Sequence, residues 1–233
     1  RSPMVQWIFH GQCCWEVITD NEMRLIIDPF LTDNPIADVG PDHFEDKLDY
    51  LLLTHGHSDH IGDAWDLIRA TGATLISTYE IVRYAQERQQ VQDAHPMHIG
   101  GGFDFPFGRV KLTPALHGGK IDGEGAEGYT TVPAGFLITI AGKTVYHAGD
   151  TGLTKDMELL RGQVDVAIVP IGDNFTMGPE DAGRAIQMIE PSIAVPMHYK
   201  TWEMIDVDPA RFIKAVGSAA KVRVLEPGDV LEL

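Results

Sequence analysis

Short apolar runs separated by turn residues predict a chain of alternating strands and helices. The N-terminal third carries three such runs, at residues 5–9, 15–19 and 25–28, which predict a meander of strands. Residues 35–49 contain two prolines, a glycine and several acidic side chains, so we expect a loop there. The continuous apolar run at residues 50–54 is typical of a strand that is buried on both faces.

The rest of the chain continues with helical and extended patterns. Helices are predicted at residues 64–70, 79–90, 179–189 and 209–216, and strands at residues 74–77, 103–107, 109–115, 136–140, 144–147, 164–170, 193–196 and 221–225. Residues 118–135 are rich in glycine and charge and are expected to form a long loop. A hairpin-rich first half and a βαβ-like second half predict an α/β fold of two packed sheets with helices outside.

Length and composition are compatible with one compact domain spanning residues 1–233. Residues 1–3 are interpreted as a cloning remnant before a native Met4, and no secretory signal is expected. No stretch approaches the roughly 18–20 apolar residues of a membrane-spanning helix, so we expect no membrane partner. The adjacent Cys13 and Cys14 point to opposite faces of an extended chain, which argues against a disulfide framework and indicates a reducing, cytoplasmic compartment.

The charge balance bears on the class of partner. The chain has 34 acidic and 18 basic side chains and a formal charge of -16. Nucleic-acid binders usually present clustered basic residues, because neutralising phosphates supplies most of their affinity. No such cluster occurs here, so nucleic acid is not expected as a partner. We expect a small-molecule substrate, and the sequence is compatible with a homo-oligomer.

One segment concentrates side chains that bind metals. THGHSDH, at residues 54–60, places His55, His57, Asp59 and His60 directly after the predicted buried strand. Imidazoles and carboxylates are preferred zinc ligands and also bind manganese, iron or nickel. His55 and His57 can face one ion from extended chain, while Asp59 and His60 on the following turn can face a second. The spacing therefore predicts two divalent ions, with zinc favoured over the other three.

A centre of this kind must be completed from elsewhere in the chain. His117, Asp150 and His198 each follow a predicted strand and precede a turn. Functional side chains gather at such positions because the strand is rigid and the loop leaves the site open. These three residues are therefore predicted to complete the metal site.

The motif set resembles the metallo-β-lactamase superfamily. It consists of H-x-H-x-D-H, then a histidine, an aspartate in a G-D-T context and a final histidine. More narrowly, PIGDNFTMGP at residues 170–179 and IDPF at residues 27–30 are similar to the uncharacterised metal-dependent hydrolase branch, which resembles the ascorbate-6-phosphate lactonases. The resemblance covers residues 5–233 and implies a four-layer αβ/βα sandwich with the site at one edge of the sheets.

The resemblance also implies a division of the ligands between the two ions. Carried over residue by residue, His55, His57 and His117 hold the first ion, Asp59, His60 and His198 hold the second, and Asp150 bridges both. The family often has a histidine after the glycine near the first strand, where this chain has Gln12 after Gly11. A substrate contact copied to Gln12 is therefore in question.

The chemistry predicted for two such ions is hydrolysis by an activated water. Ions roughly 3.5–4 Å apart lower the pKa of a shared water from about 15.7 towards about 7 and polarise a carbonyl or phosphoryl oxygen. Asp59 and Asp150 are both candidates for orienting the hydroxide or accepting its proton. The predicted reaction is hydrolysis of a small ester, lactone or phosphoester, with an anionic substrate as the working hypothesis.

Three residues outside the ligand set are assigned supporting roles. Lys200 shares a face with His198 if the intervening residue is extended, and there it would bind a substrate anion or remain a solvated rim lysine. Asp28 either hydrogen-bonds a metal-bound histidine or belongs to a plain strand-end turn. His147, three residues before Asp150, is a weaker candidate for a supporting contact.

Other functions conflict with particular features. A nuclease is disfavoured by the net charge of -16. A β-lactamase proper would have a cysteine near Asp150, whereas both cysteines lie at residues 13 and 14. A glyoxalase-type thioesterase would end in an extra helical domain, where strands are predicted here. The alternatives kept are a di-iron redox protein, which normally needs a flavin domain, and a non-hydrolytic metal-binding protein.

Overall fold

The computed structural model describes residues 4–233, and the proposed cloning remnant at residues 1–3 lies outside this range. Within it, the extended segments form two seven-stranded sheets. The first sheet has the order β14 (Val230–Glu232), β1 (Gln6–Phe9), β2 (Trp15–Ile18), β3 (Arg24–Ile27), β4 (Tyr50–Leu52), β5 (Thr74–Thr78) and β6 (Ala94–Met97). The second has the order β13 (Lys221–Val222), β12 (Ile193–Met197), β11 (Val166–Pro170), β10 (Lys143–His147), β9 (Ala134–Ile140), β8 (Gly108–Pro114) and β7 (Gly102–Phe105).

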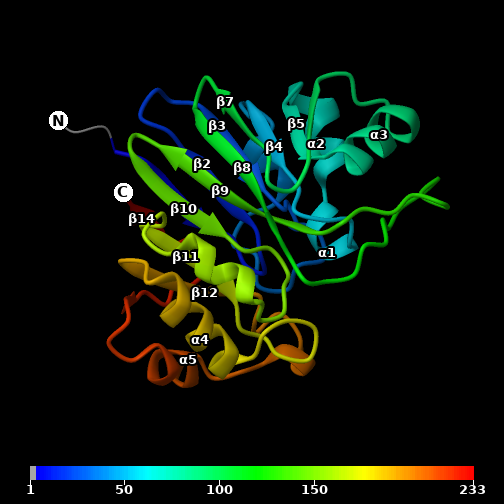
Figure 1. The fold of residues 1–233 in the computed structure, drawn as a ribbon. Helices are drawn as coiled ribbons and strands as arrows, with labels where there is room; N and C mark the ends of the chain where they lie inside the picture. Colours follow the sequence, from blue (N-terminus) through cyan, green and yellow to red (C-terminus); the bar gives the residue numbers. More distant parts are fainter. Residues whose placement is uncertain (1–3) are drawn as a thin grey trace.

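Helices cover the outer face of each sheet (Figure 1). Beside the first sheet lie α1 (Ser58–Ile61), α2 (Ala64–Thr71) and α3 (Tyr79–Arg88), and beside the second lie α4 (Pro179–Ile189) and α5 (Pro209–Val216). Three 3-10 turns complete the chain: η1 (Pro41–Phe44), η2 (Lys155–Leu160) and η3 (Glu203–Ile205). The layers are helix, sheet, sheet and helix, which confirms the predicted αβ/βα sandwich. No helix in residues 4–233 combines the length and apolar character needed to cross a membrane.

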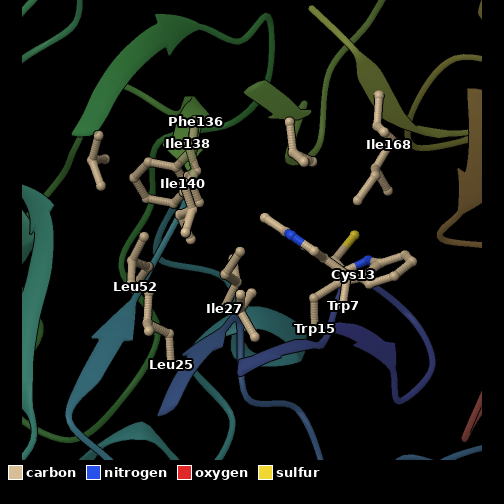
Figure 2. Close-up of a cluster of buried hydrophobic side chains, with 14 of the residues drawn as sticks. Trp7, Cys13, Trp15, Leu25, Ile27, Leu52, Phe136, Ile138, Ile140 and Ile168 are labelled. Atoms are coloured by element: carbon tan, nitrogen blue, oxygen red, sulfur yellow. The ribbon is translucent and has the colours of Figure 1, made fainter. Parts of the chain in front are cut away.

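The main core lies between the two sheets. Figure 2 shows Trp7, Trp15 and Leu52 of the first sheet facing Phe136 and Ile168 of the second. All five side chains are essentially inaccessible to solvent, and burying a large apolar side chain stabilises a fold by roughly 1.5–3 kcal/mol. This packing fixes the position of one sheet relative to the other, so residues at the sheet edges keep their distances from one another.

Cys13 and Cys14 point in opposite directions, as the sequence predicted. Cys13 packs in the core between the sheets, and Cys14 packs under the helices of the first sheet. Both thiols are buried and unpaired. The pair therefore contributes packing to two different layers and no cross-link.

Strand direction places the strand ends that carry the site at one edge. In the first sheet, β3, β4, β5 and β6 run parallel, and in the second, β10, β11, β12 and β13 do. β8 also runs in the direction of β10, because both pair antiparallel with β9. The βαβ-like second half is confirmed from β10 onward. The first half begins with the expected antiparallel strands β1, β2 and β3, but it also contains the parallel run from β3 to β6. Apolar runs mark strands but do not reveal the direction of the neighbouring strand.

Some elements differ from the sequence prediction for local reasons. β6 was missed because it contains a histidine and a proline, and β14 because two of its three residues are exposed at a sheet edge. The strand predicted at residues 221–225 shortens to β13, and the turn expected after β4 is the one-turn helix α1. The differences lie at edges and ends, where side-chain burial gives the weakest signal.

A buried ion-pair network stiffens the start of the first sheet. Glu16 on β2 accepts hydrogen bonds from Arg24 (2.6 Å) and from the rings of His10 (2.9 Å) and His43 (3.2 Å). The other ring nitrogen of His10 lies 2.8 Å from Asp38. Burial alone would raise the pKa of Glu16, but the hydrogen bonds from His10 and Arg24 outweigh it and lower the pKa from 4.5 to about 2. Glu16 is therefore ionised in the folded chain.

We expect this network to make stability depend on acid. A carboxyl with a depressed folded pKa stabilises the fold fully above its unfolded pKa, near 4.5, and loses that contribution as the pH falls through about 2. Glu16→Gln should lower the free energy of unfolding at pH 7 by at most about 3 kcal/mol. The gap from the parent should shrink between pH 4.5 and 2 in urea titrations. A gap that is constant across that range, or an equal loss in the exposed control Glu45→Gln, would contradict this role.

Candidate metal centre

The seven predicted ligand residues meet where strands of the two sheets end. β4 leads into the segment with the first four, and β8, β10 and β12 lead into the other three. Their metal-capable atoms form two groups, each with all its atoms within 4.8 Å of one another: His55, His57 and His117 in one, and Asp59, His60, Asp150 and His198 in the other. The local turns need glycine, since a Cβ on Gly56 would lie 2.7 Å from the Cα of Ile121.

The first group has three imidazole nitrogens facing one another. His57 Nδ1 lies 3.1 Å from His55 Nε2 and 3.2 Å from His117 Nε2. Ligand atoms about 2.0–2.1 Å from a tetrahedral zinc ion would be about 3.3–3.4 Å apart. The spacing of these nitrogens therefore suits one shared cation.

The second group mixes carboxylates and imidazoles. Asp59 Oδ2 lies 3.4 Å from His60 Nε2 and 3.6 Å from His198 Nε2. Asp150 Oδ2 lies 3.2 Å and 3.1 Å from the same two nitrogens. His60 Nε2 is buried and has no hydrogen-bond partner among the described residues. An orphaned nitrogen that faces two carboxylates is what an absent cation would leave, so this group also fits a metal.

Asp150 lies between the groups. Its Oδ2 is also 3.4 Å from His117 Nε2 and 3.8 Å from His55 Nε2. Its Oδ1 accepts a 3.6 Å hydrogen bond from the Cys13 thiol, which burial keeps protonated by raising its pKa. The preceding Gly149 has a φ of +62°, and a Cβ there would lie 2.8 Å from the carbonyl oxygen of residue 134. The backbone turn and the thiol thus aim one carboxylate oxygen at both groups.

Asp28 orients two of the histidines. Its Oδ2 accepts from His60 Nδ1 (2.7 Å) and from the Thr54 hydroxyl (2.6 Å). Because the hydroxyl proton is donated to Asp28, the hydroxyl oxygen accepts a hydrogen bond from His55 Nδ1, which is 2.9 Å away. Nδ1 is then the donor in both rings, and Nε2 of each ring faces the group. Thr54 was missed from the sequence, although it directly precedes the first ligand histidine.

The pKa shifts show how the buried charges balance. Burial would raise the pKa of Asp59 and of Asp150, but His60 and His198 outweigh it, so both pKa values fall and both carboxyls are ionised. Burial would lower the pKa of His198, but Asp150 and Asp59 raise it to about 9. Burial, followed by the charge of His60, lowers the pKa of His55. Two carboxylates among crowded imidazoles form a site that favours a cation.

Gln12 contacts the second group, a role that the sequence analysis did not predict. Its Nε2 donates to Asp59 Oδ2 (2.9 Å), its Oε1 accepts from the Thr201 hydroxyl, and its carbonyl oxygen accepts from His198 N–H (2.9 Å). The residue is buried and has a φ of +55°. The only sequence signal for this role was its position directly after Gly11. Its partners Asp59, His198 and Thr201 are distant in the sequence.

Two residues predicted to support the site, His147 and Lys200, make other contacts. His147 Nε2 donates to the carbonyl oxygen of Cys13 (3.0 Å) and its Nδ1 accepts from Gly149 N–H (3.2 Å), so it supports the turn before Asp150 rather than a ligand side chain. Lys200 Nζ lies 3.5 Å from Glu226. Lys200 is not among the described residues that line the cavity at the cluster. The anion-binding role predicted for it has no contact to support it.

A third group of metal-capable side chains consists of His10, Glu16 and His43. Here Arg24 already supplies the positive charge, 2.6 Å from Glu16. The group is therefore explained by its ion pairs.

A cavity of about 900 Å³ opens onto the ligand cluster. His57, Asp59, His117, Asp150 and His198 line it, together with residues of the segments 30–33, 58–63 and 202–204 and with Asp122 and Phe175. Its volume is in the range of small-molecule sites. The cluster is thus accessible to a substrate although most of its ligand atoms are buried.

Comparison with known proteins agrees with this geometry. A family model described as a β-lactamase superfamily domain matches residues 23–199. A UPF0173 metal-dependent hydrolase of Heliobacterium modesticaldum is 49% identical over 228 residues, covering 93% of each chain. One of Desulfitobacterium hafniense is 47% identical over 231 residues, covering 96% of each. The structure of Igni18, a metallo hydrolase from Ignicoccus hospitalis, has a TM-score of 0.85 and 36% identity, covering 99% of this chain and 98% of that one. The chain therefore belongs to the β-lactamase superfamily and, within it, to the UPF0173 metal-dependent hydrolases.

Proposed function

We propose that this hydrolase works with two divalent metal ions on a small ester, lactone or phosphoester. The observation that carries the proposal is Asp150 Oδ2, which lies 3.1 to 3.8 Å from one nitrogen of each of four histidines. A closed structural zinc site would use four ligands around one ion. Seven ligand residues arranged around one shared carboxylate favour two ions and an open reaction site.

In this proposal, His55, His57 and His117 hold the first ion, Asp59, His60 and His198 hold the second, and Asp150 contacts both. Bound there, two divalent ions would lower the pKa of a water towards neutrality and polarise the oxygen of the bond to be broken. Zinc is favoured by the nitrogen-rich ligand set, and manganese, iron and nickel are alternatives.

Asp59 is the better placed of the two candidate proton acceptors. Gln12, His60 and His198 all meet its Oδ2, and no described hydrogen bond engages its Oδ1. Its side chain is 21% exposed and lines the cavity. Asp150, by contrast, has its Oδ1 on Cys13 and its Oδ2 between the groups. We therefore assign Asp59 Oδ1 to take the proton that the attacking water loses, and Asp150 to hold the centre together.

The experiment that tests the function combines metal analysis with turnover. Purified protein should contain about two equivalents of metal and hydrolyse at least one member of a panel of lactones, carboxylic esters and phosphodiesters. A chelator should abolish the turnover, and zinc or manganese should restore it. One equivalent or less, with no turnover after reloading, would favour a non-hydrolytic metal-binding protein. A coloured, iron-loaded protein that consumes oxygen would favour the di-iron redox alternative.

Asp150→Asn should disturb both ions at once. The amide keeps the size of the carboxylate but removes the charge, so we expect the metal content to fall below one equivalent and kcat/KM to fall at least about 100-fold. Asp33→Asn, which lines the same cavity outside the cluster, is the matched control and should keep both ions. Two tightly bound ions with unchanged turnover in Asp150→Asn would refute the shared role.

Gln12→Met should weaken one ion selectively. Methionine has a similar length but cannot donate to Asp59, so the affinity for the second ion should fall about 10- to 100-fold while the first is retained. Titration with a competing chelator measures the two affinities separately. Gln92→Met, on the surface, is the control. If Gln12→Met leaves both affinities unchanged, Gln12 does not position Asp59.

A further inference from the structure

Four large apolar side chains line the cavity at the ligand cluster, and we call them the aromatic wall: Phe30, Phe175, Trp202 and Met204. Three of these side chains are strongly exposed: Phe175 by 50%, Trp202 by 41% and Met204 by 63%. The rings of Phe30 and Trp202 lie 6.0 Å apart. Large apolar side chains exposed singly are ordinary, but several gathered beside a metal-binding cluster are typical of a ligand site.

The backbone holds the aromatic wall in place at a cost in strain. Asp173 and Asn174, directly before Phe175, have φ values of +60° and +52°, a region that non-glycine residues seldom adopt. The Asp173 N–H donates to the carbonyl oxygen of Met177 (3.0 Å), and the Met177 N–H donates to that of Thr151 (3.0 Å). On the other loop, the N–H of Lys200, two residues after His198, donates to the carbonyl oxygen of Ile205 (3.0 Å). Both loops are thus tied to the strand ends that carry the cluster.

The charged residues that line the cavity outside the cluster are acidic. Apart from the cluster itself, Asp33, Asp63, Asp122 and Glu203 line it, and we call these four the acidic rim. No lysine or arginine occurs among the described lining residues. The lysine nearest in sequence to His117, Lys120, is ion-paired with Asp122 at 2.9 Å. A negatively charged group on the substrate, away from the reacting bond, would meet no lysine or arginine among these lining residues and three carboxylates without a described ion pair: Asp33, Asp63 and Glu203.

We propose that the substrate carries an apolar body without negative charge, which packs on the aromatic wall while the bond to be broken lies at the ligand cluster. This inference rests on the proposed hydrolytic function and names its substrate class. It replaces the anionic substrate expected from the sequence, since Lys200 is engaged by Glu226 and does not line the cavity. A positive charge on the body is compatible with the acidic rim.

A matched series of esters tests the charge selectivity. The three compounds are 2-phenylethyl acetates with a para methyl, aminomethyl or sulfomethyl group, in which the methylene and ethyl spacers keep the reactivity of the carbonyl equal. At low salt, kcat/KM for the sulfonate should be about tenfold below that for the methyl compound, and the ammonium compound should match or exceed the latter. A sulfonate turned over as fast as the methyl compound would overturn the proposal.

A binding measurement separates failure of this inference from failure of the proposed function. The probes are the three parent alcohols, added to the zinc-loaded protein and followed by Trp202 fluorescence. Trp7 and Trp15 are buried, and Trp65 packs against Tyr84 outside the cavity lining, so the response should disappear in Trp202→Phe. If no ester is hydrolysed, ester hydrolysis fails, and the binding order of the alcohols still decides the substrate class. Sulfonate binding equal to that of the methyl alcohol would again overturn the proposal.

Two sets of variants locate the effect in the cavity. Trp202→Ala should weaken the methyl alcohol at least about fivefold, measured by calorimetry, whereas Leu159→Ala, an equally apolar residue that is 73% exposed outside the cavity, should not. Asp33→Asn combined with Glu203→Gln should reduce the ratio of kcat/KM between the methyl ester and the sulfonate ester about threefold. The surface pair Glu45→Gln with Asp46→Asn is the control. Equal effects of the cavity variants and their controls would contradict the assignment.

Discussion

The buried carboxylate of Asp150 is the interaction on which the rest of the site depends. An ionised carboxylate removed from water costs several kcal/mol unless positive charge or hydrogen bonds compensate it. Here the compensation comes from His198 and His60. Together with His55 and His117 they follow strands of both sheets and place a nitrogen 3.1 to 3.8 Å from a single oxygen of Asp150. Those histidines can meet only if the two sheets keep one fixed position relative to each other. The core between the sheets therefore sets the distances within the site.

The strain in the backbone follows from the same requirement. Asp28, Gln12 and His198 are non-glycine residues with positive φ, and each lies within or beside the ligand cluster. Such conformations cost about 1–3 kcal/mol each and persist where surrounding contacts determine them. Asp28 fixes the ring of His60, and Gln12 joins Asp59 to the His198 backbone. At these three positions the backbone strain accompanies contacts that orient the metal-capable side chains.

The sequence reveals what is local and leaves out what depends on packing. The gathering of four metal-capable residues within residues 54–60 with three at strand ends could be predicted, because metal chemistry restricts the residue types and strand ends restrict their places. Gln12 and Thr54 could not, since ordinary polar residues acquire a role only through their partners. For Lys200, sequence proximity to His198 suggested a substrate contact that stays a prediction; in the structure its ammonium lies 3.5 Å from Glu226. The direction of neighbouring strands in the first sheet, and the wall joining Phe30 to Trp202, also arise only in three dimensions.

Family membership establishes a metal-dependent hydrolase, while the number of ions and their sharing of Asp150 are the central claim. The most direct measurement is a crystal structure of the metal-loaded protein with anomalous data at the absorption edge of the bound metal. The account predicts two anomalous peaks, one among His55, His57 and His117 and one among Asp59, His60 and His198, with Asp150 Oδ2 about 2.0–2.3 Å from both. A single peak, or two peaks of which only one contacts Asp150, would contradict it.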